Sequence, residues 1–495
     1  MAWYGNLPYL SIFFAMCAGI AVSAVRNGKA AYRVTVLTAA LISVMSMVFL
    51  VLADRAGVSM SFTMGKFPAP FGNEIRFGPL QGLFASCFSL VMTLALLGGR
   101  SDFFSDVTEK KQGLACVFLL MTLASLLVLT YTNDAFTGYV FIEISTISAC
   151  ALVSVKDRGP TLMATIRYLF MSLLGSGLFL FGLVLLYTVT GHLLMPQLAE
   201  KIRLLAASGQ YRLPLLLSLW LMTAGLGVKS AMFPFHRWLP DAHGSATTTA
   251  SAVLSGLVLK GYIVLMITLF VRVFTLPVMR ELGIGDVIFT FGLLGMIVGS
   301  VYAMRESHVK RMLAYSSVAQ VGYIFMGIGL MNPAGITAAC FQILAHACTK
   351  PLLFCSAGRL SAAMHHKKDL HGLYGSGCRA PLAGVGFTVG ALSMIGVPLL
   401  AGFTSKLNFA AASVQSDEKM LLTLLVLALS TVLNALYYIP AVTVIWSRSE
   451  EADAERQKGS AAENIAIILL IALVFALGIA YAPIIRLIAD GFKLI

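Results

Sequence analysis

Residues 228–265 read VKSAMFPFHRWLPDAHGSATTTASAVLSGLVLKGYIVL, and this stretch sets two lysines among apolar residues. Lys229 follows the run LPLLLSLWLMTAGLG, and Lys260 lies well inside the next apolar run. Pro234 lies just beyond Lys229 and deprives the Ser230 carbonyl of its helical partner. Interrupted helices at membrane depth are tolerated only where they are buried in protein or line a water-filled cavity. The stretch therefore predicts two membrane helices with buried lysines, the first of them broken.

The composition of the whole chain is that of an integral membrane protein. Of the 495 residues, 58% are hydrophobic and only 12% are charged, whereas a soluble protein of this size carries roughly 25% charged residues. Basic loops on one side of a membrane account for the net charge of +13, so we expect no nucleic-acid partner. The eight cysteines form no C-x-x-C pair, which argues against an iron–sulfur cluster or a zinc knuckle.

Hydropathy between polar breaks predicts an all-α polytopic protein with about fourteen spans and no soluble domain. The first apolar run is expected to be a retained helix, because the start has neither a basic residue nor a small-residue cleavage site. The expected spans are residues 8–25, 34–53, 79–98, 113–131, 135–154, 166–190, 214–233, 246–271, 284–303, 312–330, 336–358, 382–409, 420–446 and 463–485.

The distribution of Lys and Arg predicts the orientation. Loops after odd-numbered helices carry 20 of these residues, and the opposite side, with both termini, carries 11. Because basic loops stay in the cytoplasm, we expect both termini outside, in a multi-pass protein of the cell membrane. The remaining basic residues all lie within predicted spans, and they are Lys229, Lys260, Lys350 and Lys406.

A lysine at the bilayer centre costs about 2.5–3.5 kcal/mol, so four of them call for an explanation. We expect at least three to line a hydrated interior path; the alternative is that they snorkel to the headgroups or pair structurally. Glu143 is the one carboxylate in the middle of a predicted span. Burial and pairing shift the proton affinities of lysine and glutamate in opposite directions, so a Lys–Glu pair of changing separation can bind and release a proton. The alternative is a static ion pair.

A second broken helix is predicted in SMIGVPLLAGFTSK, where Pro398 and Gly402 precede Lys406. The two broken helices, 7 and 12, are five apart in order. A five-helix repeat begins its copies on opposite faces of the membrane, so the copies are expected to be inverted.

Histidines add further candidates for a proton relay. His346 and Lys350 are four residues apart and share a helix face. His236 and His243 flank the break of helix 7, where a relay and a structural hydrogen-bonding role are equally open. A loop cluster, His365, His366 and His371, is either a metal site or, as we favour, a solvated basic loop. No G-x-S-x-G, P-loop or dinucleotide motif indicates a catalytic or cofactor site.

The helix 7–8 stretch resembles the signature of the antiporter-like subunits of respiratory complex I, of Mrp-type sodium/proton antiporters and of energy-converting membrane-bound hydrogenases. The segments that support this resemblance are FIEISTISACALV, RYLFMSLLGSGLFLFGLVLLY, KRMLAYSSVAQVGY and LAHACTKPLLFCSAGRL, and the resemblance spans roughly residues 110–410.

This resemblance implies a division into residues 1–112 (helices 1–3), 113–271 and 284–446 (inverted repeats of helices 4–8 and 9–13) and 463–495 (helix 14). It also implies a proton pathway through Glu143, Lys229, Lys260, His346, Lys350 and Lys406. In having a lysine at position 406, the chain resembles the D-type members of the Mrp antiporters.

The leading functional hypothesis is a proton-translocating subunit, with sodium exchange left open, that works beside other membrane subunits. No metal, cofactor or catalytic residue is expected in this chain. The alternatives are a freestanding secondary transporter and a quinone-linked membrane oxidoreductase subunit.

Overall fold

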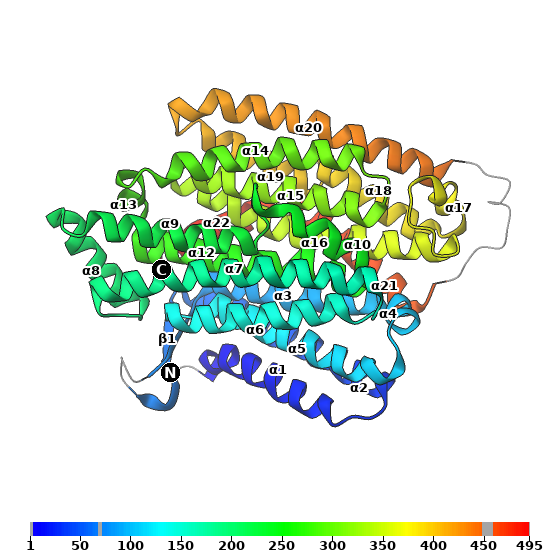
Figure 1. The fold of residues 1–495 in the computed structure, drawn as a ribbon, viewed down its shortest axis with the longest axis horizontal. Coiled ribbons are helices and arrows are strands. Elements are labelled where there is room, and N and C mark those ends of the chain that lie inside the picture. Colours follow the sequence, from blue (N-terminus) through cyan, green and yellow to red (C-terminus); the bar gives the residue numbers. More distant parts are fainter. Residues whose placement is uncertain (1–2, 68–71, 448–458, 495) are drawn as a thin grey trace.

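The computed structural model describes residues 3–67, 72–447 and 459–494, and this part of the chain is almost entirely helical. The long helices run side by side along one direction (Figure 1). Among the described residues, twelve helices are long and apolar enough to cross a membrane, or thirteen if residues 371–379 and 381–395, bent by 116°, count as one span. The all-α polytopic membrane architecture is confirmed.

Each expected span has a helical counterpart. The first six are α1 (Leu7–Ser23), α2 (Gly28–Ala56), α3 (Pro79–Gly98), α5 (Glu109–Tyr131), α6 (Ala135–Ser154) and α7 (Gly159–Thr190). The eighth span runs from α11 (Thr248–Val253) through the π-helix η4 (Leu254–Val258) and α12 (Leu259–Thr268) to the π-helix η5 (Leu269–Phe274). The ninth to eleventh are α14 (Ile284–Arg305), α15 (Val309–Gly329) and α16 (Pro333–Ala363), and the last two are α20 (Asp417–Trp446) and α21 (Ala461–Ile479).

The seventh and twelfth spans are interrupted, as expected. α9 (Arg212–Lys229) ends beside its lysine and is followed by η3 (Phe235–Arg237) and α10 (Trp238–Ser245). Five residues, 396–400, separate the end of α18 (Pro381–Ile395) from the start of α19 (Ala401–Ser413). The Trp238 indole donates to the carbonyl of Val228 at 3.2 Å, which satisfies one of the carbonyls at the end of α9.

Short elements join the spans. They are η1 (Trp3–Asn6), η2 (Met64–Lys66), α4 (Arg100–Asp106), α8 (Met195–Ser208), α13 (Leu276–Glu281), η6 (His371–Leu373), α17 (Ser376–Arg379) and α22 (Tyr481–Lys493). Residues 54–78, between the second and third expected spans, contain an antiparallel hairpin of β1 (Met60–Thr63) and β2 (Glu74–Phe77), with Met60 opposite Phe77. The last span ends at Ile479, earlier than the expected residue 485, and α22 begins two residues later.

Both termini lie at the same end of the bundle, and α4, α10 and α17 lie at the other end (Figure 1). The carbonyl of Leu494 accepts hydrogen bonds from Ser59 and Arg76, which fixes the C-terminus beside the hairpin between the second and third spans. A cavity at the opposite end is lined by residues from the loops after the third, fifth, ninth and eleventh spans. The loops therefore alternate between two faces as predicted, and we call the face with the odd-numbered loops the basic face.

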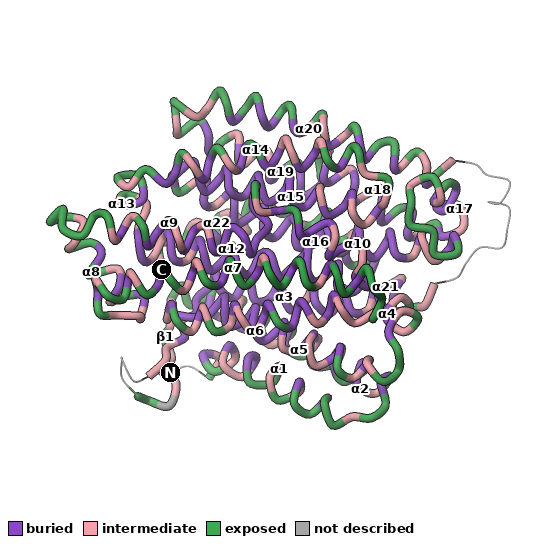
Figure 2. Tube along the Cα trace, viewed as in Figure 1, coloured by how far each residue is buried: buried purple, intermediate pink, exposed green. Residues whose placement is uncertain are grey.

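The most buried spans are those in the centre of the bundle. The most apolar 18-residue window is 94% buried in residues 248–274 and in α15, and 100% buried in α16. The outer helices α2, α7 and α20 expose apolar side chains such as Leu37, Phe170 and Leu425 (Figure 2). This arrangement fits a bundle surrounded by lipid, because the outer helices expose apolar side chains and the central spans are covered by protein. Two of the four intramembrane lysines belong to these central spans.

Glycines bring helices into close contact near the lysines. A Cβ on Gly225 of α9 would lie 2.5 Å from the carbonyl oxygen of Gly175 on α7, and a Cβ on Gly175 would lie 3.1 Å from Cγ of Lys229. Small residues at such contacts let membrane helices pack backbone to backbone. The division into two inverted repeats and flanking segments stays a prediction, and its outer parts include residues 1–2, 68–71 and 495, which lie outside the described residues.

Candidate functional site

Lys229 and Glu143 lie together at the broken end of α9. The Nζ of Lys229 is 3.6 Å from Oε1 of Glu143 on α6, and it donates a hydrogen bond of 2.5 Å to Oγ1 of Thr146 on the same helix. The lysine side chain is 1% exposed and that of the glutamate 24%. Tyr262 of α12 places its ring 5.9 Å from Nζ and donates to Ser145 at 3.2 Å. The sequence prediction of a Lys–Glu pair thus has a geometric counterpart, with the acid at the edge of the bundle.

Lys260 is completely buried next to a π-helical turn. Its Nζ donates 2.7 Å to the carbonyl oxygen of Ser255, five residues earlier in the same span. π-bulges are rare and occur often at functional sites. No carboxylate lies within 4 Å of its ammonium group among the described residues, so a backbone dipole is its principal partner.

Lys350 lies at the centre of α16, which lies at the centre of the bundle. Its Nζ donates to the Leu313 carbonyl and to Ser316 Oγ on α15, each at 2.9 Å, and to the Tyr438 hydroxyl at 3.4 Å. His346 lies one turn earlier and is equally buried, and neither of its ring nitrogens has a hydrogen-bond partner in the described part of the chain. A Cβ on Gly256, one turn before Lys260, would lie 2.7 Å from Cγ of Pro351, so the helices that carry Lys260, His346 and Lys350 pack against each other at this level.

Lys406 lies beyond the break between α18 and α19. Its Nζ donates 2.6 Å to the Ile395 carbonyl at the end of α18 and 2.8 Å to Oγ1 of Thr431 on α20. A cation at the C-terminal end of a helix is stabilised by the exposed carbonyl dipoles. The Tyr323 ring lies 5.6 Å away. Unlike Lys229, Lys406 has no carboxylate within 4 Å in the described residues, and it is only partly buried.

The two histidines beside the break of helix 7 lie in different surroundings. His243 is completely buried, stacks on Phe354 with ring centroids 4.9 Å apart, and has no partner for either nitrogen among the residues described. Phe354 lies on α16 one turn after Lys350, which places the His243 ring beside the central span. His236 instead lies between aromatic rings, 6.2 Å from that of Tyr302. The structure therefore joins His243, rather than His236, to the central group.

The loop histidines form no metal centre in the residues that the structure describes. No group of three or more His, Cys, Asp or Glu side chains there is arranged to hold a metal ion. His365 and His366 are exposed, each with a positive φ.

Sequence reasoning missed a polar stripe on α20. Tyr438 faces Lys350, Thr431 faces Lys406, and Asn434 lies between them in sequence. The Asn434 side chain donates 3.2 Å to the Met394 carbonyl near the end of α18 and accepts 2.7 Å from the Tyr437 hydroxyl. The spacing of residues 431, 434 and 438 is that of one helix face. This spacing of polar residues within an otherwise apolar span is the sequence signal that could have identified the stripe.

Comparison with known proteins assigns the chain to a family. The family model described as NADH:quinone oxidoreductase/Mrp antiporter, TM matches residues 132–433, which include all six pathway candidates. The chain belongs to this family. It is 30% identical over 449 residues to NADH-quinone oxidoreductase subunit N of Desulforudis audaxviator (strain MP104C), covering 88% of this chain and 86% of the relative.

Two further relatives of the antiporter family come from different assemblies. An Na(+)/H(+) antiporter subunit of Bacillus subtilis (strain 168) is 28% identical over 431 residues, covering 84% of this chain and 83% of the relative. A chain in the structure of the archaeal membrane-bound sulfane sulfur reductase is 26% identical, with a TM-score of 0.85 over 99% of this chain and 96% of that one. The chain is thus an antiporter-like membrane subunit, as its resemblance to the family implied.

Proposed function

We propose that this chain translocates protons across the cell membrane along its buried lysines, as one subunit of a multisubunit complex. The observation that carries the proposal is the central group of Lys260, His346 and Lys350. Two ammonium groups there are bound by hydroxyls and carbonyls instead of carboxylates. Burial without a counter-ion favours the neutral amine, so each lysine can both accept and release a proton.

The proposed path links the two broken helices through this centre. Glu143 and Lys229 form one end, where the separation of the pair controls proton affinity. Lys260, His346 and Lys350 form the middle, and Lys406 forms the other end. His243 lies beside the middle group, whereas His236 is given no part in the path.

The polar stripe of α20 supports the last step. Lys350 is bonded to Tyr438, and Lys406 is bonded to Thr431 two turns away on the same helix. Hydroxyl and amide groups with water between them can carry protons over such a distance. We infer the order of the groups from this geometry.

The proposed partners are other membrane subunits. Glu143 is a quarter exposed at the bundle edge, on a helix that also exposes Phe136, Val140 and Ile147. A neighbouring membrane subunit on this face would remove the glutamate from lipid and complete its surroundings. A related chain is named as part of an Na(+)/H(+) antiporter, so exchange of protons for sodium is the second form of the function to be tested.

The experiment is proton transport by the native complex, extracted in mild detergent and reconstituted into liposomes with an internal pH dye. Mass spectrometry of the co-purifying subunits decides the driving force, either a redox substrate or an imposed sodium gradient. Lys260→Met is expected to abolish transport in an assembled complex. Lys201→Met, an exposed lysine on α8, is the control and should transport normally. Normal transport by assembled Lys260→Met would contradict the proposal.

We also infer that both termini face outward, because basic loops prefer the cytoplasm. A reporter active only in the cytoplasm is expected to give no signal when fused after residue 495. The same reporter inserted after His366, on the basic face, should be active. The reverse pattern would overturn the orientation.

A further inference from the structure

A charged cavity of about 290 Å³ lies on the basic face, apart from the proposed row of lysines. Its walls come from α4, the start of α15, the end of α16 and the loop after α6. The lining residues used below are Asp102, Asp106, Lys156, Lys310, Ser361 and Lys368. The cavity therefore brings together segments from both halves of the chain.

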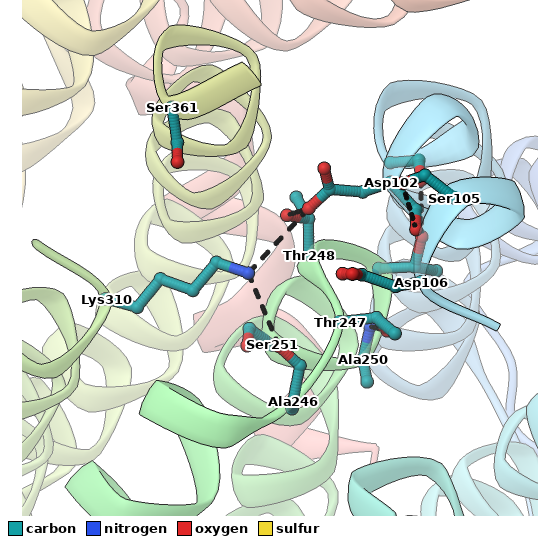
Figure 3. A network of polar contacts seen from close by, with 12 residues as sticks. Asp102, Ser105, Asp106, Ala246, Thr247, Thr248, Ala250, Ser251, Lys310 and Ser361 are labelled. Atoms are coloured by element: carbon teal, nitrogen blue, oxygen red, sulfur yellow. Dashed lines mark hydrogen bonds and ion pairs between the residues drawn. The ribbon is translucent and has the colours of Figure 1, made fainter. Parts of the chain in front are cut away.

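Lys310 reaches from the first turn of α15 across this cavity. Its Nζ lies 3.8 Å from Oδ2 of Asp102 and donates 3.3 Å to the carbonyl oxygen of Ala246. Asp102 also accepts a hydrogen bond from the Thr248 hydroxyl at the start of α11. Figure 3 shows the lysine between α4 and the α10–α11 connection, with the Asp106 carboxylate directed toward the same space. The lysine and aspartate side chains are 14% and 15% exposed.

Charged residues of both signs line the cavity around Lys310, among them Asp102, Asp106, Lys156 and Lys368. Lys156 is itself paired with Asp106, with 2.5 Å between Nζ and Oδ2. Lys310 is thus left with one loosely held carboxylate and one carbonyl, a setting in which both the charged and the neutral amine can exist.

The inner side of this site leads to His243. Ala246, which accepts from Lys310, lies three residues after His243, and the Ser251 hydroxyl donates 3.2 Å to the His243 carbonyl. The His243 ring stacks on Phe354 of α16, one turn after Lys350, so it lies between the Lys310 site and the central span. His243 has no hydrogen-bond partner for either ring nitrogen in the described residues, so one of them is free to accept a proton.

We propose that this cavity is the site of proton exchange with the basic face, where Lys310, held by Asp102 and Ala246, passes protons between water and His243. In one step a hydronium ion in the cavity protonates the neutral Lys310 amine and leaves water. In the next step the Lys310 ammonium loses that proton, through intervening water, to a nitrogen of neutral His243, which becomes an imidazolium. His243 then delivers the proton to a central lysine and returns to its neutral form. The proposal rests on the proposed proton transport.

A purely structural role for Lys310 would be to hold α4 against the α10–α11 connection. Three substitutions separate the two roles. Lys310→Arg keeps the charge and the hydrogen-bond donors but cannot release its proton at any useful pH. Lys310→Met removes both the charge and the hydrogen-bond donors. Lys310→His is shorter and neutral at pH 7, but it still titrates. Lys110→Met, an exposed lysine on the basic face outside the cavity, is the matched control.

The measurement is proton transport by the reconstituted native complex, with assembly checked on native gels. Lys310→Met and Lys310→Arg are each expected to transport at least about tenfold more slowly, as for loss of a positioned proton-transfer group. Lys310→His is expected to retain partial transport, and Lys110→Met to transport normally. Full transport by Lys310→Arg would overturn the proposal and leave Lys310 as a structural tie.

Lys260→Met is run in parallel to keep the two proposals distinguishable. If Lys260→Met abolishes transport and Lys310→Arg does not, only the exchange site is wrong. If assembled Lys260→Met transports normally, the proposed function itself fails.

A second measurement avoids any substitution of Lys310. Ser361→Cys places a thiol on the cavity wall, and a bulky charged thiol reagent is added to the assembled complex from the basic face. Transport is expected to fall severalfold, while the parent complex with Ser361 and its native cysteines is unaffected by the reagent. A fully labelled Ser361→Cys complex that transports at its original rate would contradict the proposed exchange site.

Discussion

The Nζ of Lys229 lies closer to the hydroxyl of Thr146, at 2.5 Å, than to the carboxylate of Glu143, at 3.6 Å. The ammonium group is therefore shared between a neutral acceptor and a charged one on the same helix. No hydrogen bond to Glu143 Oε1 exists among the described residues. A small movement of the end of α9, where the helix is already broken, can change which acceptor dominates. A Lys–Glu pair whose separation changes requires an ammonium group that can move between two acceptors in this way.

Lys229→Ala and Glu143→Ala are each expected to abolish transport in assembled complexes. Removal of one partner leaves the other uncompensated, which costs about 3–5 kcal/mol for a fully buried pair. The cost is smaller here because Glu143 is a quarter exposed. Transport in proteoliposomes is the measurement, after assembly has been checked on a native gel. Normal transport in either assembled variant would mean that the pair is structural.

Asn434→Leu is expected to slow transport by breaking the polar stripe between Lys350 and Lys406. The substitution is close in volume but removes both the donor to Met394 and the acceptor for Tyr437. Loss of these bonds also costs about 1–3 kcal/mol of stability. Thr443→Val on the exposed face of α20 is the control. Equal transport rates in the two assembled variants would show that the polar stripe is not part of the proton path.

Lys406 is expected to require titration rather than charge alone. Lys406→Arg keeps a charge that cannot be released, so it should block transport almost as fully as Lys406→Ala. Lys406→Glu is expected to keep partial transport, because a carboxylate with raised proton affinity can still titrate there. The measurement is the initial rate of proton movement by complexes that carry each of the three substitutions. Full transport with arginine would identify Lys406 as a fixed electrostatic barrier.

Gly225→Val is expected to destabilise the contact between α7 and α9 that positions Lys229. Its Cβ would lie 2.5 Å from the Gly175 carbonyl and 2.7 Å from the Phe179 nitrogen, so the helices must separate. Overpacking of this kind costs typically about 1–3 kcal/mol. Gly177→Val on α7, where a Cβ meets no atom within 4 Å, is the control. The temperature of thermal unfolding in detergent should be lowered in Gly225→Val and not in Gly177→Val.

The spans and the residues that break them could be predicted from the sequence because lipid imposes simple rules. Apolar runs of membrane length, Pro234 after Lys229 and Pro398 before Lys406 each act locally. The partners of the lysines could not be predicted in the same way. Thr146, Ser316 and Tyr438 are ordinary residues of apolar helices until packing brings them to an ammonium group.

The surface elements were harder to predict for the same reason. The hairpin of β1 and β2 forms within residues 54–78, a segment that reads as a polar linker. The pairing of Lys310 with Asp102 joins loops far apart in the chain, and no local pattern encodes that contact. His236 and His243 are equivalent in sequence, and only the fold separates them.

The most direct test of a proton path through the buried lysines is the number of protons moved per turnover by the reconstituted complex with Lys350→Met. Lys350 belongs to the central group, lies on the span that is buried throughout, and is bonded to Ser316 on α15 and to Tyr438 on α20. The account predicts that proton movement through this chain is lost while the complex stays assembled and any redox reaction continues. An assembled Lys350→Met complex that moves as many protons per turnover as the unsubstituted one would contradict it.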